Sequence, residues 1–550
     1  MRGVARVRGT RRLTIVALML ALTACGGGPT IPFISSPTPE QPRELVVRVV
    51  ELSAKRPLAG ARISGAEAPV LTSKDGTAQI TALPGAKLTV AADDHDSATA
   101  SVPAQGDVTV TLRPNVVTGR VTDAAGKPLI GAKVFVDGQP TVVRTDPDGE
   151  YRLPGVPAKG TLVIKLAGYR LGLLPISGQA TQDVAMQPFQ ARALYAPASV
   201  FEGAGHLDQM LATIGNTEAN AMVIDVKEGG GWLYYATDLP EAKQAGAIMK
   251  SPLLHLDTVL PKLKARGIYT IARMVVMKDD TLPKSRPQLA VKNVQTGKPW
   301  TDFGGNIWLD PFEPGVAEYI AKIAVDLANK GFDEVQLDYV RFYSDGNYNT
   351  ADTTLPNTQS FRLPAIQRLF RVVSNALAPT HAFFGADVFP ISFIAKDDQG
   401  IGQRPEVIMP YVDYFDPMVY PSHYGPYTFG YAVPNEHPYE IINRSLQIMN
   451  REAAVLNKAL KIRPWIQDFG YGSFRAYTAT DIHAEMKALR DNGAAGWMIW
   501  NAAARFTVGA LGPPRPGENS APMTTTAAVS STATPSPSPS PASAAPSASP

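Results

Sequence analysis

Hydrophobic and polar residues follow two different patterns along the chain, and the change between them separates two kinds of folded region. From 44 to 190, short strand-like runs are separated by turn residues such as Asp-Gly, which favours tight hairpins. From about 192 to 511, strand-like runs alternate with helical ones. Within 315–330, Val316, Ile320, Ile323 and Leu327 form one apolar stripe at helical spacing, and Gly331 ends the helix.

The second region, 191–511, predicts a (β/α)8 TIM barrel. The expected strands are 193–201, 221–226, 269–276, 334–338, 382–387, 414–420, 461–467 and 496–500, and the expected helices include 251–266, 315–330, 359–378, 440–459 and 480–492. A doubly wound open sheet is the alternative, but no glycine-rich phosphate loop opens any of these helices.

The first region contains an internal repeat with a period of about 70 residues. "KRPLAGARI" (55–63) matches "GKPLIGAKV" (126–134), and "TSKDGTAQI" (72–80) matches "TDPDGEYRL" (145–153). We therefore expect two small all-β, immunoglobulin-like sandwiches, 44–114 and 115–190. The second pattern resembles the carboxypeptidase regulatory-like domain, and this resemblance implies a non-catalytic module that acts as a spacer or in adhesion.

Both ends of the chain differ from these folded regions. Arginines precede the apolar run "LTIVALMLAL" and then "LTAC", which predicts a signal peptide over 1–24. "LTAC" resembles the lipobox of bacterial lipoproteins, and this resemblance implies lipidation of Cys25. From their composition we expect residues 25–43 to be a Gly/Pro/Ser linker and 512–550 to be a disordered Pro/Ser/Ala-rich tail. The expected location is outside the cytoplasm, on a membrane.

Composition narrows the possible partners. The formal charge of +3 depends on five arginines at the N-terminus, and without them the chain is nearly neutral, so nucleic-acid binding is not expected. Cys25 is the only cysteine, which excludes an intramolecular disulfide and a thiolate metal cluster. We expect a monomer with no cofactor.

Polar and aromatic side chains recur where the expected barrel strands end, which is where barrel enzymes place their chemistry. In "GFDEVQLDYVRFYSDG" (331–346), Glu334, Gln336 and Asp338 share one strand face, and we expect that face to line a pocket. The corresponding rim residues are Asp225, Lys227, Arg273, Tyr339, Arg341, Asp387, Asp416, Tyr420, His423, Gln467 and Trp500.

Paired carboxylates are the chemistry that this rim favours. No His-x-His or His-x-x-x-His pair indicates zinc, and no G-x-S-x-G elbow indicates an α/β-hydrolase. Asp338 and Asp387 end consecutive strands roughly 4.8 Å apart, a separation that favours retaining glycoside hydrolysis. Asp225 and Asp416 are the alternative partners, and Arg341 or Arg273 is expected to keep Asp338 ionised.

Aromatic residues support a sugar substrate, because a flat ring with a polar edge suits a sugar ring. Those expected in rim loops are Trp232, Tyr234, Trp300, Tyr343, Tyr424 and Tyr427. Trp308, Trp465 and Trp497 are expected in the core.

A family resemblance rests on "NAMVIDVKEGGG", "FDEVQLDYVRF", "GADVFP" and "DPMVYPSHY". These segments resemble the bacterial family named "putative glycosyl hydrolase domain", which is placed among TIM barrels near the α-amylase type. That resemblance implies Asp338 as nucleophile and Asp387 as acid/base. The amylase type uses glutamate in the second role, so this chain departs from it.

Three functions follow from these observations. The first is a surface-anchored lipoprotein that hydrolyses an extracellular or cell-wall polysaccharide. The second is a non-catalytic polysaccharide-binding lipoprotein. The third is a structural protein of the cell envelope, which requires the rim residues to be buried in salt bridges with no open groove.

Overall fold

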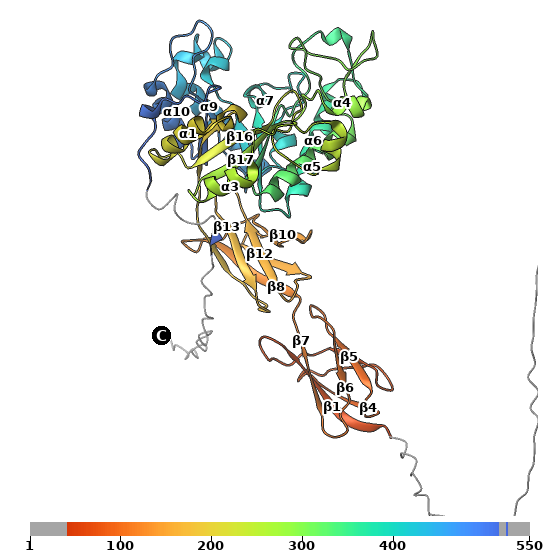
Figure 1. The fold of residues 1–550 in the computed structure, drawn as a ribbon. Helices are drawn as coiled ribbons and strands as arrows, with labels where there is room; N and C mark the ends of the chain where they lie inside the picture. The colour runs from red at the N-terminus through yellow and green to blue at the C-terminus, as the bar shows by residue number, and fades with distance from the viewer. Residues whose placement is uncertain (1–40, 516–523, 526–550) are drawn as a thin grey trace, which may run out of the picture.

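The computed structural model describes residues 41–515 and 524–525. Two small β-domains lead into a large α/β domain, and the three follow one another as an elongated molecule (Figure 1). Cys25, the expected signal peptide and most of the Pro/Ser/Ala-rich tail lie outside the described residues. Among the described helices, none is both long and apolar enough to cross a membrane.

The two β-domains are sandwiches with the same strand order, as the internal repeat predicts. The first pairs a β4-β1-β7 sheet with a β3-β2-β5-β6 sheet, and the second pairs β11-β8-β14 with β10-β9-β12-β13. Thr524–Thr525 (β26) adds to the edge at β13. Their bounds are β1 Arg43–Glu51, β2 Arg62–Ser64, β3 Val70–Leu71, β4 Thr77–Ala82, β5 Lys87–Ala91, β6 Ala98–Ser101, β7 Val108–Leu112, β8 Val116–Asp123, β9 Lys133–Val136, β10 Val142–Arg144, β11 Glu150–Pro154, β12 Gly160–Lys165, β13 Leu171–Ile176 and β14 Val184–Met186.

The matched Asp-Gly turns explain why glycine recurs at the same place in both repeats. Gly76 and Gly149 have φ of 72° and 77°, the left-handed region that favours glycine. A Cβ at Gly76 would lie 2.7 Å from the carbonyl oxygen of Val49, and one at Gly149 would lie 2.5 Å from that of Val121. Each turn therefore packs its backbone directly onto the first strand of its own sandwich.

The large domain is a closed parallel barrel. One sheet runs β23-β22-β21-β19-β17-β16-β15-β25-β24. Since β23 and β24 are two halves of one strand separated by Arg463 and Pro464, this order closes into a ring of eight. The bounds are β15 Ala191–Ala196, β16 Ala221–Lys227, β17 Tyr269–Val275, β19 Glu334–Asp338, β21 Phe383–Val388, β22 Tyr414–Pro417, β23 Lys461–Ile462, β24 Trp465–Gln467 and β25 Gly496–Trp500.

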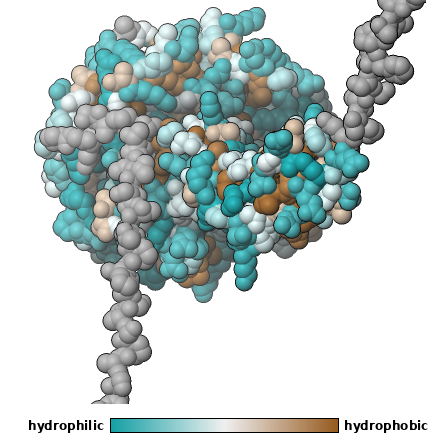
Figure 2. All heavy atoms as spheres, turned by 90° about the horizontal axis from the view of Figure 1, so that it is seen from below, coloured by the Kyte–Doolittle hydropathy of each residue, from teal (hydrophilic) through white to brown (hydrophobic). Residues whose placement is uncertain are grey.

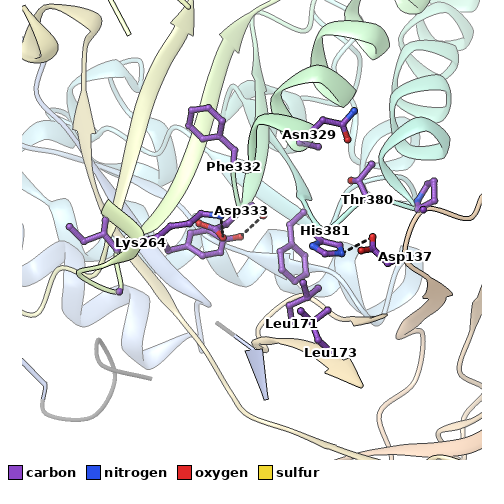
Figure 3. Close-up of a pocket in the computed structure, with 17 residues that line it drawn as sticks. Asp137, Leu171, Leu173, Lys264, Asn329, Phe332, Asp333, Thr380 and His381 are labelled. Carbon is purple, nitrogen blue, oxygen red and sulfur yellow. Dashed lines mark hydrogen bonds and ion pairs between the residues drawn. The ribbon is translucent and has the colours of Figure 1, made fainter. Parts of the chain in front are cut away.

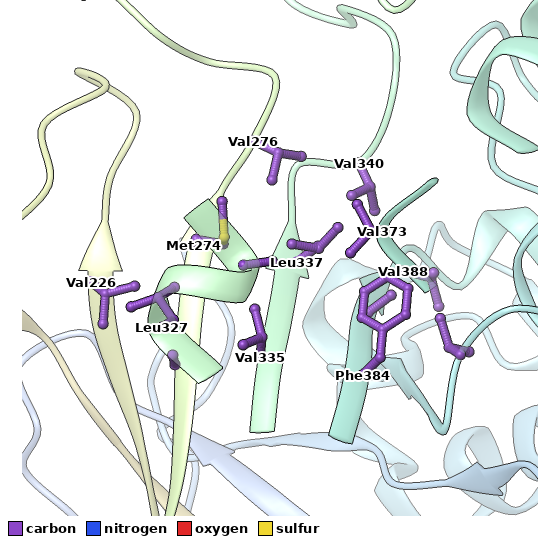
Figure 4. Close-up of a cluster of buried hydrophobic side chains, with 14 of the residues drawn as sticks. Val226, Met274, Val276, Leu327, Val335, Leu337, Val340, Val373, Phe384 and Val388 are labelled. Atoms are coloured by element: carbon purple, nitrogen blue, oxygen red, sulfur yellow. The ribbon is translucent and has the colours of Figure 1, made fainter. Parts of the chain in front are cut away.

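Helices cover the outside of the ring, and the outward-facing strand residues pack against them. In Figure 4, Val335 and Leu337 of β19 lie with Met274, Leu327 and Phe384 in this outer layer, and all are buried. The main helices are α1 Ala204–Gly215, α3 Leu256–Lys264, α5 Pro314–Lys330, α6 Gln359–Leu377, α9 Pro438–Leu456 and α10 Ala479–Asp491.

Four expected elements are shorter or broken in the structure. The expected helix 251–266 is α3, which covers only Leu256–Lys264. Residues 198–201 form a 3-10 turn rather than the end of a strand, and β22 stops at Pro417. The expected strand 461–467 is interrupted because Pro464 has no N–H to donate to a neighbouring strand.

The second sandwich is attached to the barrel at the end where the strands begin. Lys133 Nζ lies 2.8 Å from Asp413 Oδ1. The fully buried Lys165 Nζ donates to the carbonyl oxygens of Leu377, Thr380 and Ala382 at 3.0, 2.7 and 2.7 Å. Seen from the sandwich end, the surface is mostly hydrophilic, with hydrophobic residues in small separate patches (Figure 2).

Candidate active site

The barrel interior carries charged side chains in two layers, and the lower layer is closed. Arg463 donates to both carboxylate oxygens of Glu334, at 2.9 and 2.5 Å, and to Asp416 Oδ2 at 3.1 Å. Gln336 Nε2 also donates to Asp416, at 2.8 Å. All four side chains are fully buried. Glu334 and Gln336 alternate with Val335 and Leu337 as expected. However, Glu334, Gln336 and Asp416 do not line the pocket, because they are hydrogen-bonded to one another and to Arg463 inside the barrel.

The upper layer is centred on Arg273, at the C-terminal ends of the strands. Arg273 Nη1 lies 2.5 Å from Asp225 and 3.3 Å from Glu228, while Nη2 lies 2.5 Å from Asp338. Its Nε lies 3.7 Å from Asp387 Oδ2. One guanidinium on β17 thus contacts four carboxyl groups, from β16, β19, β21 and the loop after β16.

A pocket of about 210 Å³ opens above this layer. Eight of the residues expected from the sequence line it: Arg273, Asp338, Tyr339, Arg341, Asp387, Tyr420, His423 and Trp500. Four further lining residues are Phe389, Gln403, Met418 and Trp465. The rim residues that pair in salt bridges therefore still leave an open pocket.

Asp338 ends β19 at the wall of this pocket. It accepts a hydrogen bond from the Tyr339 backbone N–H at 2.5 Å in addition to the Arg273 contact. Tyr339 has a φ of 55°, which an aromatic residue rarely adopts. This sharp turn directly after the strand brings the Tyr339 amide back onto the Asp338 carboxylate.

Asp387, at the matching position of β21, has a different environment. It is 1% exposed, and the Trp465 indole N–H donates to Oδ1 at 2.6 Å. Burial raises the pKa of Asp387 well above its usual range, and the charges of Asp338 and Asp416 raise it further. Arg273 and the Trp465 hydrogen bond oppose this shift without cancelling it. Asp387 therefore tends to hold a proton beside the ion-paired Asp338.

Asp225 lies behind Arg273 rather than at the pocket. The Tyr195 hydroxyl donates to its Oδ2, and burial raises the pKa of Asp225 well above the ordinary value despite Arg273. Glu228, in contrast, has a lowered pKa: burial raises it, but hydrogen bonds from Asp225 and Arg273 outweigh burial. We therefore place Asp225 among the residues that position Arg273.

Lys227 does not reach the pocket, and a β-bulge is the reason. The register between β16 and β17 shifts between Asp225 and Lys227, so Lys227 lies opposite Met274, which belongs to the outer layer. Its Nζ lies 3.1 Å from Asp279 Oδ2. Simple alternation places Lys227 beside Asp225, and the one extra residue reverses its direction.

Gln467 is likewise a positioning residue for the loops. It is buried, its Oε1 accepts from the Ser422 backbone N–H at 3.2 Å, and its Nε2 donates to the Phe469 carbonyl at 2.9 Å. Ser422 precedes the pocket-lining His423, and Phe469 lies in the loop after β24. Gln467 therefore holds these two loops together.

Four residues at the site are missed or placed differently by sequence reasoning. Trp465 was expected in the core, and it is buried, yet its N–H contacts Asp387. Tyr195 is the second-last residue of β15, where alternation along the strand is the available signal, and its ring packs at a tilt on Trp500 with centroids 3.9 Å apart. Phe389 and Gln403 come from a loop for which no pattern indicates direction.

A larger cavity, of about 600 Å³, lies at the opposite end, between the second sandwich and the barrel. Figure 3 shows Asp137 paired with His381 on one side of it, with Leu171 and Leu173 from β13 nearby, and Asp137 Oδ1 lies 3.0 Å from His381 Nε2. A second lining acid, the partly buried Asp333, accepts from the Thr270 N–H and hydroxyl at 2.9 and 2.7 Å. This cavity has no carboxylate pair like Asp338 and Asp387. Among the described residues, no group of acids, histidines or cysteines is arranged to hold a metal ion.

The sequence of the barrel domain matches a known protein family. Residues 193–506, more than half of the chain, match the family described as "Putative glycosyl hydrolase domain". The chain belongs to this family. Residues 116–187 of this glycosyl hydrolase-family protein match the carboxypeptidase regulatory-like domain, which is the second sandwich. No curated protein matches the chain.

Solved structures similar to this glycosyl hydrolase-family protein include a hypothetical protein from Ruminiclostridium thermocellum ATCC 27405, with 29% identity over 36% of this chain and 97% of that one and a TM-score of 0.32. The PgaB (BpsB) glycoside hydrolase domain from Bordetella bronchiseptica has 16% identity over 58% and 95%, with a TM-score of 0.43. The catalytic domain of β-amylase from Paenibacillus polymyxa has 11% identity over 60% and 95%, with a TM-score of 0.40.

Proposed function

We propose that the barrel hydrolyses O-glycosidic bonds of a polysaccharide, with Asp338 as nucleophile and Asp387 as general acid and base. The observation that carries the proposal is the contrast between these two acids in one pocket. Asp338 is held by Arg273 and a backbone N–H, whereas burial raises the pKa of Asp387. A glycosidase needs one ionised and one protonated carboxyl group at the same bond.

The proposed reaction has two steps. Asp387 gives its proton to the glycosidic oxygen while Asp338 attacks the anomeric carbon, so the C–O bond breaks and a glycosyl ester forms on Asp338. Asp387, now a carboxylate, takes a proton from water, and the water oxygen displaces Asp338. Leu337 pairs with Ala386, so Asp338 and Asp387 are next to each other in register on adjacent strands. That spacing favours the retaining outcome.

Exposed aromatic residues support a polymeric substrate. Within the described residues, every large aromatic side chain that is exposed belongs to the barrel domain: Trp232, Phe303, Tyr348, Phe361, Tyr427, Tyr471 and Phe474. All but Phe361 lie in segments that follow barrel strands, at the same end as the pocket. His423, which lines the pocket, packs on Tyr471, and Tyr471 stacks on Phe474. This row gives neighbouring sugar units a surface outside the pocket.

The decisive experiment measures reducing-sugar release from a panel of polysaccharides by the full chain. Asp338→Asn should abolish release, and Asp387→Asn should lower it about 10²–10⁴-fold, as loss of a general acid does. An aryl glycoside with a good leaving group should lose less in Asp387→Asn, because it needs no proton. Asp397→Asn, which changes an exposed acid in the loop after β21, is the matched control.

The outcomes separate the functions. Full activity in Asp338→Asn would remove that residue from the mechanism. Binding of a polysaccharide without release by the wild type would favour a non-catalytic binding lipoprotein. Inversion of the anomeric configuration, followed by NMR of the first product, would overturn the retaining mechanism while leaving hydrolysis intact.

We also propose that the protein is exported and anchored outside the cytoplasm through a lipid on Cys25. The support is the basic and apolar leader followed by "LTAC". Cys25→Ser should move the protein from the membrane fraction to the soluble fraction and abolish incorporation of labelled fatty acid. Membrane association that survives this change would contradict the lipid anchor.

A further inference from the structure

Arg341, on the pocket wall, carries a buried positive charge without a closely paired acid. The side chain is 4% exposed, and Nη1 donates to the Phe342 carbonyl at 3.1 Å and to the Ser344 hydroxyl at 2.7 Å. Its Nε has no hydrogen-bond partner. The nearest carboxylate, that of the half-exposed Asp345, lies 4.0 Å from Nη2. Within residues 41–515, Nη2 donates no hydrogen bond.

Three other buried arginines of the barrel, Arg273, Arg362 and Arg463, have acids at hydrogen-bond distance. Arg362 contacts both oxygens of Asp398 at 2.7 Å. Arg463 contacts both oxygens of Glu334, and Arg273 lies 2.5 Å from two acids. Burying a guanidinium costs much free energy unless an anion compensates it. Arg341 therefore differs from these three arginines, because its nearest acid is half-exposed and 4.0 Å away.

The surroundings of Arg341 hold it in place without neutralising it. Its guanidinium lies 4.9 Å from the Trp308 ring, 5.1 Å from Tyr339 and 5.1 Å from Phe389. Ring faces attract a cation but carry no net charge. Tyr339 and Phe389 line the pocket together with Arg341, so the guanidinium is held beside the ligand space.

We propose that Arg341 binds a carboxylate on the sugar ring held in the pocket, so that the substrate is an acidic polysaccharide. A planar guanidinium with a free edge matches a carboxylate in shape and charge. The pocket, at about 210 Å³, is shared with Asp338 and Asp387, so the acidic sugar is one that adjoins the cleaved bond. The carboxylate belongs to a uronic acid or to the lactyl ether of muramic acid. This inference rests on the proposed function for the position of the acidic sugar next to the cleaved bond. The binding of a carboxylate by Arg341 does not depend on hydrolysis.

The proposed carboxylate site is tested by measuring binding rather than turnover. The full chain is titrated in a calorimeter with trigalacturonate, with its methyl ester, with a muramic-acid-containing disaccharide and with neutral galactotriose. We expect one or both acidic probes to bind, and the methyl ester and galactotriose to bind about tenfold or more weakly, which is the range for a lost charged hydrogen bond. Which acidic probe binds distinguishes the two sources of the carboxylate.

Three variants make the result specific to Arg341. Arg341→Gln should remove the preference for acidic probes, and Arg341→Lys should keep part of it. Arg505→Gln, an exposed arginine in the loop after β25, removes the same charge from the same end of the barrel and should change nothing. Thermal unfolding confirms that each variant folds. If Arg341→Gln fails to fold, two other results overturn the proposal. One is a preference for acidic probes that is unchanged in Arg341→Lys, and the other is binding of the methyl ester as tightly as trigalacturonate.

The two proposals can fail separately. Preference for the acidic probes without any hydrolysis would leave the carboxylate site standing and remove the glycosidase. Hydrolysis of neutral polysaccharides, with acidic and neutral probes bound equally by the wild type, would overturn the carboxylate site and leave the glycosidase.

Discussion

At the scale of single residues, the proton on Asp387 governs the proposed activity. Because its pKa is raised, the acid stays protonated at pH values where an ordinary aspartate is ionised, and activity falls as pH rises through the raised pKa. The Trp465 hydrogen bond favours the ionised form and so lowers that pKa. Trp465→Phe should therefore move the alkaline limb of kcat/KM to higher pH.

The control for this prediction is a second tryptophan. Trp497→Phe makes the same chemical change in β25, on the side that packs against the helices, and should leave the alkaline limb where it is. A limb that moves to lower pH in Trp465→Phe, or does not move, would show that another group donates the proton.

At the scale of elements, a glycine in β21 makes room for the lower charged layer. A Cβ at Gly385 would lie 2.5 Å from Glu334 Oε1 and 2.6 Å from Asp416 Oδ2. Gly385→Ala should therefore lower the free energy of unfolding by ~1–3 kcal/mol, the usual range for overpacking. Denaturant unfolding measures it. Gly425→Ala, where a Cβ meets nothing within 4 Å, should change stability by less than ~1 kcal/mol.

Strand alternation explains how much of the site the sequence predicts. It identifies which residues of β19 and β21 face inward, because both strands are regular. It fails at Lys227, since a bulge adds one residue without any marker in the sequence. Alternation also does not show how deep in the barrel an inward-facing side chain lies. Asp416 and Asp387 both follow the inward pattern of their strands, but only Asp416 is close enough to Arg463 to form an ion pair. Loop residues such as Gln403 have no periodicity to follow.

At the scale of the whole molecule, two lysines join the second sandwich to the barrel. Burial alone raises the pKa of Asp413, but Lys133 and Lys165 hold it below its ordinary value of 3.8. The stabilisation is therefore present above that ordinary value and is lost as pH falls through the folded pKa. Lys133→Met should cost up to ~3 kcal/mol at neutral pH. The difference from the wild type should shrink toward zero below about pH 4.

Thermal unfolding at a series of pH values measures this difference. Lys127→Met, in the exposed turn of the same sandwich, is the control and should show no such dependence. A loss for Lys133→Met that stays constant down to acidic pH would contradict an electrostatic contribution from the pair.

The pocket and the attached sandwich lie at opposite ends of the barrel, and this arrangement determines how a pulling force passes through the molecule. When the N-terminal part is held and a polymer is gripped at the rim, tension passes lengthwise through the barrel and then through the short polar contacts of Lys133 and Lys165. Such contacts extend little before they rupture, whereas the barrel is closed on itself. Under a steady pull we expect these contacts to break first, so that the barrel separates from the sandwich while it stays folded and joined to it by the chain between β14 and β15.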